Sequence, residues 1–201
     1  MNWESLYFPL GSHFLSANDV NDIEQQLKKF PLEEITIGDA GEINNCQVGR
    51  LMEDQPGEIP KILNQTLSKP ILDFYTSPIG KQFFAQFLEQ PYPQYVRRSQ
   101  FNLLGKGSFV GRHLDVDSNP NYQIAAVLQL GSRFEGGDFL VYSSKDSNSD
   151  SAQRITPEFG SLTISFCRFE HEVMEVTSGT RTSFVCFITN DNLLNMRSIA
   201  V

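Results

Sequence analysis

The chain has 201 residues, of which 40% are hydrophobic, which is enough for one well-buried core and short for two. Its formal net charge of −8 disfavours binding to the phosphate backbone of nucleic acid, and no apolar run reaches the length of a membrane span. No basic segment followed by an apolar stretch opens the chain, so we do not expect export. Cys46, Cys167 and Cys186 form no CxxC motif, so we expect free thiols and a cytoplasmic protein.

The first half of the chain has the spacing of helices. Apolar residues at helical intervals follow the capping segment Ser16–Asp19, which predicts a helix over 20–30. Pro78 precedes an aromatic stripe, which predicts a helix over 79–87. A shorter helix is expected within 57–68, and 32–52 is expected to be irregular or partly extended. We interpret the aromatic stripes as core rather than as cofactor contacts.

From residue 93 onward the pattern changes to short runs with strand composition, separated by glycines and polar turn residues. Strands are predicted near 94–104, 108–115, 121–131, 137–143, 153–156, 161–167, 171–176 and 181–189. Many short strands in succession are typical of a β-sandwich or jelly roll.

These patterns together predict one domain over 1–201, of α+β class with a mainly β core. Residues 1–92 would be a mostly helical supporting segment packed on the outside, 93–191 the jelly-roll core, and 192–201 a tail. The serine-rich stretch 143–152 is predicted to be a loop, either a lid over the site or a disordered connection.

Two imidazoles and a carboxylate in the second half predict a metal site. His113 and Asp115 are two residues apart, so in a strand both point to one side, and His171 begins a later strand that a jelly roll can bring alongside. This is the ligand set of a facial triad, which holds iron(II) and leaves coordination positions open. Asp117 shares the face, but strand twist and the turn at Asn119 carry it away, so we expect a lesser role. The alternative is a surface pair with an unrelated later histidine.

Arg181 and Ser183 share one face of a predicted strand that is otherwise apolar. A guanidinium beside a hydroxyl suits a buried carboxylate, and the alternative is a salt bridge to an internal Asp or Glu. Arg97, Arg98 and Arg112 flank the proposed site, and each is interpreted either as a ligand of a substrate carboxylate or as a solvated charge.

Residues 101–191 resemble the catalytic core of the iron(II)/2-oxoglutarate-dependent oxygenases, in particular the prolyl 4-hydroxylase-like branch. The resemblance rests on His113-Leu-Asp115, Phe134–Asp138, Pro157–Gly160, His171-Glu-Val173 and Arg181-Thr-Ser183 in this order. It implies a double-stranded β-helix in which His113, Asp115 and His171 bind iron(II). It implies also that Arg181, helped by Ser183, binds the distal carboxylate of 2-oxoglutarate.

The chain departs from the family pattern at two tyrosine positions. Leu103 stands where family members often carry the first, and Gln129 is the nearest candidate for the second. Gln129 or Tyr122 is therefore our candidate for completing the 2-oxoglutarate pocket.

The resemblance implies an enzyme, a dioxygenase that uses iron(II), 2-oxoglutarate and O2, with ascorbate as a supporting reductant. It would hydroxylate an aliphatic carbon of an amino acid, a peptide or protein, or another small metabolite, and release succinate and CO2. Related halogenases replace the triad carboxylate with a small residue, so Asp115 disfavours halogenation. Phe187 stands where the nucleic-acid repair enzymes of the superfamily carry a second arginine. We therefore expect no nucleic-acid and no membrane partner.

Two other classes of protein stay open, and the sequence leaves the oligomeric state open as well. A non-enzymatic jelly-roll metal-binding or sensor protein would keep the three ligands without a use for Arg181. A metal-dependent hydrolase would use the same ligands with a general base nearby, for which Glu170 and Glu172 face the wrong side of the strand.

Overall fold

The computed structural model describes residues 4–38, 41–131 and 133–197. Its helices are α1 (Ala17–Leu27), α2 (Gln65–Thr76), α3 (Pro78–Phe84) and the 3-10 turn η1 (Asp115–Asp117). Its strands are β1 (Ser5–Phe8), β2 (Glu33–Ile37), β3 (Ile43–Glu53), β4 (Lys61–Ile62), β5 (Tyr95–Gly105), β6 (Val110–His113), β7 (Ile124–Leu130), β8 (Phe134–Gly136), β9 (Phe139–Val141), β10 (Gln153–Ile155), β11 (Leu162–Phe166), β12 (His171–Val173) and β13 (Val176–Thr189).

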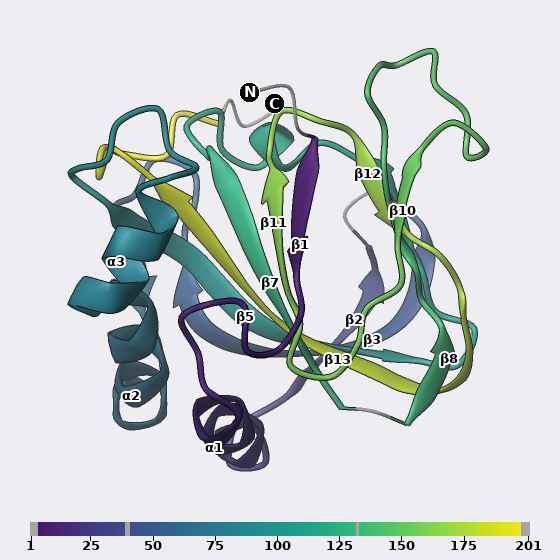
Figure 1. Cartoon of the computed structure of the whole chain (residues 1–201), viewed down its shortest axis with the longest axis horizontal. Coiled ribbons are helices and arrows are strands. Elements are labelled where there is room, and N and C mark those ends of the chain that lie inside the picture. Colours follow the sequence, from purple (N-terminus) through teal and green to yellow (C-terminus); the bar gives the residue numbers. More distant parts are fainter. Residues whose placement is uncertain (1–3, 39–40, 132, 198–201) are drawn as a thin grey trace.

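Two antiparallel sheets face each other and confirm the predicted double-stranded β-helix (Figure 1). The larger sheet has the order β1-β11-β7-β13-β5-β3-β2, with β4 paired to β3 and β8 paired to β13. The smaller sheet has the order β10-β9-β12-β6. The order brings strands that are far apart in the chain into contact, so β12 lies between β9 and β6.

Alternation along β13 divides the hydrophobic core from the interior between the sheets. Phe184, Cys186 and Ile188 point to the outer face and join the largest core cluster. Arg181 and Ser183 point to the opposite face because neighbouring side chains of a strand alternate. The same strand therefore anchors the fold with one face and lines the functional interior with the other.

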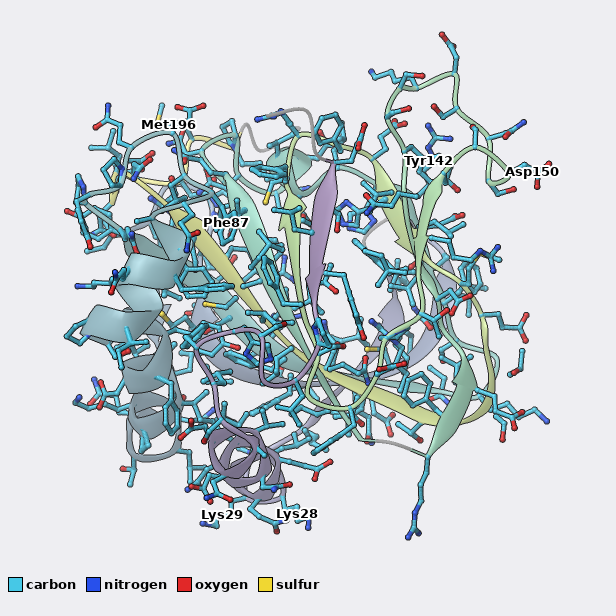
Figure 2. All side chains as sticks on the ribbon, in the orientation of Figure 1. Lys28, Lys29, Phe87, Tyr142, Asp150 and Met196 are labelled. Carbon is cyan, nitrogen blue, oxygen red and sulfur yellow. The ribbon has the colours of Figure 1, made fainter. Side chains whose placement is uncertain are left out.

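The helices pack on the outer face of the larger sheet, as predicted (Figure 1). Ser16 caps α1 in a reciprocal capping box with Asp19, which satisfies backbone donors at the helix start. Ser77 caps α3 by accepting from the backbone of Gly80, with Pro78 in the first turn. In Figure 2, Phe87 lies beside α3 on the side of the sheet, while Lys28 and Lys29 extend outward beyond α1.

Several predicted elements differ from the structure. The stretch 32–52, expected to be irregular or partly extended, forms β2 and β3, because β3 pairs with β5 along most of its length. The helix expected at 57–68 begins only at Gln65, after β4. The predicted strand 108–115 ends at His113. The predicted strand 137–143 is shorter in the structure, where it is β9, and the separate strand β8 precedes it. The segment 1–92 is thus less helical than predicted, since long-range pairing recruits four of its stretches into the larger sheet.

Candidate metal centre

The structure brings His113, Asp115 and His171 together, with one ligand atom of each lying within 4.8 Å of the others. His113 ends β6 and His171 begins β12, and the two residues are direct cross-strand partners. Their ring centroids are 4.4 Å apart. Asp115 Oδ1 lies 3.6 Å from His113 Nε2 and 3.5 Å from His171 Nε2. This arrangement is a three-residue site of the size that a single metal ion requires.

The sequence predicted that Asp115 reaches the site from a strand. In the structure it reaches the site from the turn η1. Leu114 is still extended, and the chain then turns so that Asp115 is buried while Asp117 is exposed. The turn separates the two carboxylates that a continuous strand would place on one face. Asp117 consequently lies outside the cluster, in line with the lesser role expected for it.

Backbone carbonyls fix both histidines in one tautomer. Nδ1 of His113 lies 2.8 Å from the carbonyl oxygen of Gly111, and Nδ1 of His171 lies 3.0 Å from that of Phe169. A carbonyl only accepts hydrogen bonds, so each Nδ1 carries a proton, and Nε2 is the nitrogen of each ring that faces Asp115. Neutral imidazoles with this support are the form that binds a divalent metal.

The electrostatics of Asp115 keep it ionised. Burial by itself would raise the pKa of its carboxyl, but the facing His171 and His113 outweigh that effect and hold the pKa below the usual range. Asp115 Oδ2 is buried and has no hydrogen-bond partner among the described residues. The adjacent Cys167 thiol has its pKa raised by burial and by the charge of Asp115. A buried anionic oxygen of this kind is suited to a cation.

Arg181 is a buried guanidinium, only 4% exposed, and its Nε has no hydrogen-bond partner among the described residues. Burial lowers its pKa to about 10, although Asp138 opposes the shift. Gly137 makes room for the side chain, because a Cβ there would lie 2.7 Å from Cδ of Arg181. A desolvated cation in this state favours an incoming anion. Ser183, 2% exposed, follows on the same face.

A single cavity of about 350 Å³ contains both halves of the predicted site. The triad residues His113, Asp115 and His171 line it, and so do Arg181 and Ser183. The wall between them is largely apolar, with Val110, Phe139 and Val173 among its residues. The arrangement combines a metal-sized ligand cluster with a fixed cation in one concave, mostly apolar space, as expected of a small-molecule site.

Gln129 and Tyr122 do not line this cavity in the structure. Gln129 stands beside Ser183 across the strands, but its amide nitrogen donates to the main-chain oxygen of Thr182 at 2.7 Å. The Tyr122 ring stacks on Phe187 at 4.6 Å in a buried cluster. Backbone bonding holds the amide nitrogen of Gln129, whose Oε1 is buried with no hydrogen-bond partner among the described residues, and ring packing holds Tyr122. A contact of either side chain with 2-oxoglutarate stays a prediction.

The three flanking arginines have different environments. Arg97 is fully buried, and its guanidinium pairs with Asp54 at 2.9 Å and with Asp191 at 3.1 Å, so it is structural. Arg112 binds Glu170 and lies over the Tyr142 ring at 3.8 Å. Arg98 alone of the three lines the cavity.

Arg112 also holds the 143–152 loop, which the sequence predicted as a lid or a disordered connection. Its guanidinium donates to the main-chain oxygens of Ser144, Lys145 and Ser147. Figure 2 shows Tyr142 at the base of this projecting loop and Asp150 near its outer end. The loop is therefore anchored at its base, directly beside the strand that carries His113.

The sequence did not reveal that the first half of the chain completes the cavity. Glu42, Asn44 and Arg50, from β3 and the turn before it, line it, as do Gln100 and Asn102 of β5. The alternation of Cys46, Val48 and Arg50 was the available signal, since it marks one face of a strand. The sequence alone does not show that β3 pairs with β5, so it could not place this face of β3 in the cavity.

Comparison with known proteins agrees with this geometry. Residues 99–189 match the family model of the 2OG-Fe(II) oxygenase superfamily. No curated protein sequence matches the chain. A solved oxidoreductase of the 2OG-Fe(II) oxygenase family from Burkholderia pseudomallei is 29% identical, with a TM-score of 0.86, over 98% of this chain and 89% of that one.

More distant solved structures share the fold. A prolyl-4-hydroxylase from Pseudomonas putida is 18% identical over 92% of each chain, with a TM-score of 0.57. The epimerase SnoN, solved with Fe3+, α-ketoglutarate and nogalamycin RO, is 12% identical over 93% of this chain and 79% of its own, with a TM-score of 0.62.

These matches confirm the resemblance seen in the sequence: residues 99–189 belong to the 2OG-Fe(II) oxygenase superfamily. Residues 99–189 therefore have the sequence and fold of the oxidoreductases of this class, and the predicted iron(II) and 2-oxoglutarate are the pair for which the superfamily is named. Among the helices in the described ranges, none combines the length and apolar character needed to cross a bilayer.

Proposed function

We propose that this protein is a hydroxylase that oxidises an aliphatic carbon of a small molecule or peptide. His113, Asp115 and His171 would hold iron(II), and Arg181 with Ser183 would bind the distal carboxylate of 2-oxoglutarate. The observation that carries the proposal is the shared cavity: the only clustered metal ligands found among the described residues open into the same space as the unpaired Arg181.

The donor set fits the proposed groups. The two Nε2 lone pairs and the buried Asp115 oxygen give a divalent ion two neutral ligands and one anionic ligand. When bound, iron(II) and 2-oxoglutarate supply the activation of O2, so that substrate C–H becomes C–OH while 2-oxoglutarate becomes succinate and CO2.

The protein groups position and shield the reactants. The carbonyls of Gly111 and Phe169 fix the orientation of the imidazoles. Arg181 neutralises the far end of the cosubstrate and sets its direction across the cavity, because a guanidinium binds a carboxylate in a fixed planar geometry. The apolar wall excludes water from the reacting carbon.

The two alternative functions have less support. A metal sensor has no use for a buried arginine that lacks an ion pair within the described residues. A hydrolase needs a free general base beside the metal. Glu170 is bound by Arg112, Glu172 accepts from Tyr142, and the cavity-lining Glu42 accepts from the backbone of Gly111. The free, buried cysteines favour the expected cytoplasmic location.

Anaerobic addition of iron(II) and then 2-oxoglutarate tests the proposal. We expect a weak visible absorption band from the chelate, followed by succinate when air is admitted. His113→Ala should abolish both, whereas Asp117→Asn, which removes an exposed carboxylate four residues away in the chain, should keep both. Absence of band and succinate in the wild type, together with unchanged iron affinity in His113→Ala, would overturn the proposal.

A further inference from the structure

A second cationic position lies at the other end of the cavity floor. Arg181 of β13 pairs in register with Leu104 of β5, and Arg98 lies six residues further along β5. Strand geometry separates these two positions by roughly 20 Å between Cα atoms. Both arginines line the same cavity, on the larger sheet, facing the strands that carry the histidines.

Arg98 carries an uncompensated charge. Among the residues in the described ranges, no carboxylate forms an ion pair with it, in contrast to Arg97, which binds two, and Arg50, which binds Glu33. Its Nε donates to Oε1 of Gln100 at 3.2 Å. Its guanidinium lies over the Phe187 ring at 5.8 Å from the centroid. The remaining guanidinium nitrogens are therefore available to a ligand.

Gln100 positions this guanidinium. Its buried Oε1 accepts from Arg98 and also from Nη1 of Arg50 at 3.1 Å, while its amide nitrogen donates to Asn102 at 2.7 Å. The orientation of Gln100 is thus fixed, because its oxygen must face the two arginines. A guanidinium held in this way loses little freedom when it binds a carboxylate.

An apolar floor lies beside Arg98. Ala125, Val127, Val185 and Phe187 project from neighbouring strands into the cavity. Val116, next to Asp115 in the chain, packs against this group. Aliphatic carbons on this floor would lie beside the triad, with a polar terminus at Arg98.

From this arrangement we infer that the oxidised substrate is an aliphatic carboxylate, whose carboxylate binds Arg98 while its carbon chain covers the apolar floor. The inference rests on the proposed function, since it names the substrate class of that same site. Arg181 and Arg98 then give the two organic acids separate anchors on either side of the triad. A carboxylate fits better than a phosphate, because Arg98 is a single unpaired cation and the adjacent Arg50 is already bound to Glu33.

Matched acids and amides test the inference. Short aliphatic carboxylic acids and aliphatic L-amino acids are each compared with their own carboxamide. Calorimetry measures binding to the enzyme loaded with iron(II) and 2-oxoglutarate without oxygen, and succinate formation is followed after oxygen is admitted. The proteins are the wild type, Arg98→Gln, Arg98→Lys and the control Arg133→Gln. Arg133 is an exposed arginine that does not line the cavity.

We expect acids to bind and to stimulate succinate formation, and their amides to fail. Arg98→Gln should weaken acid binding by about 30-fold or more, with Arg98→Lys intermediate and Arg133→Gln unchanged. The affinity for 2-oxoglutarate and its visible band should persist in Arg98→Gln, which also shows that the variant folds.

Equal binding of acid and amide, an unchanged acid affinity in Arg98→Gln, or no binding by any acid of the panel would overturn the inference. In each of these cases, a normal visible band in the wild type leaves the proposed function standing. Loss of that band in the wild type would instead refute the proposed function itself.

Discussion

Replacing Arg181 with methionine should stabilise the metal-free protein and weaken the binding of 2-oxoglutarate. The buried charge of Arg181 destabilises the fold when no anion is bound, but the proposed function requires that charge to bind the cosubstrate. The side chain is 4% exposed, and burial lowers its pKa to about 10. At about 1.4 kcal/mol per pKa unit, the charged form costs the folded protein on the order of 3 kcal/mol. Methionine keeps much of the volume without the charge.

The free energy of unfolding of the metal-free protein should therefore rise by about 1–3 kcal/mol in Arg181→Met. The affinity for 2-oxoglutarate should fall about 100-fold to 1000-fold, since removing one partner of a buried ion pair costs about 3–5 kcal/mol. Iron(II) binding should remain, because Arg181 is not among the clustered metal ligands.

Urea unfolding of the metal-free protein measures the first effect, and anaerobic titration of the visible band measures the second. Arg133→Met serves as the control for loss of an exposed arginine. A 2-oxoglutarate affinity within about threefold of the wild type would refute the proposed contact, since a buried pair is worth more than that. A clear loss of stability would refute the view that Arg181 lacks an internal partner.

Three further predictions, on Arg97, His13 and Arg112, concern the scaffold. Arg97→Leu should cost about 3–5 kcal/mol in urea unfolding because it leaves the fully buried Asp54 without its partner, whereas Asp191→Asn, whose side chain is 32% exposed, should cost less. Burial lowers the pKa of His13, so as the pH drops below about 6.5 the unfolded chain takes up a proton before the folded protein does, and the free energy of unfolding falls. Urea midpoints measured across this pH range should fall less steeply in His13→Gln than in the wild type. An unchanged slope would contradict the role of His13. Arg112→Gln should speed proteolysis within 143–152, and an unchanged cleavage rate would show that the loop is held by other contacts.

The sequence by itself determined the class of fold and the chemistry of the centre. Short strands between glycines are typical of a β-sandwich or jelly roll, the family resemblance implied a double-stranded β-helix, and that is the fold observed. His113, Asp115, His171 and Arg181 could be named in advance because their residue types and order carry the chemical requirement. The helices at Ala17–Leu27 and Pro78–Phe84 were also predictable, since capping residues and apolar spacing are local signals.

Only the tertiary structure decided which other residues complete the cavity. The strands β2 and β3 depend on pairing with β5, an interaction between distant segments that propensity does not encode. The same limit applies to the arginines: Arg97 and Arg98 are neighbours in the sequence, yet alternation buries one between two acids and presents the other to the cavity. Residue type fixes what a side chain can do, whereas strand register fixes which partner it meets.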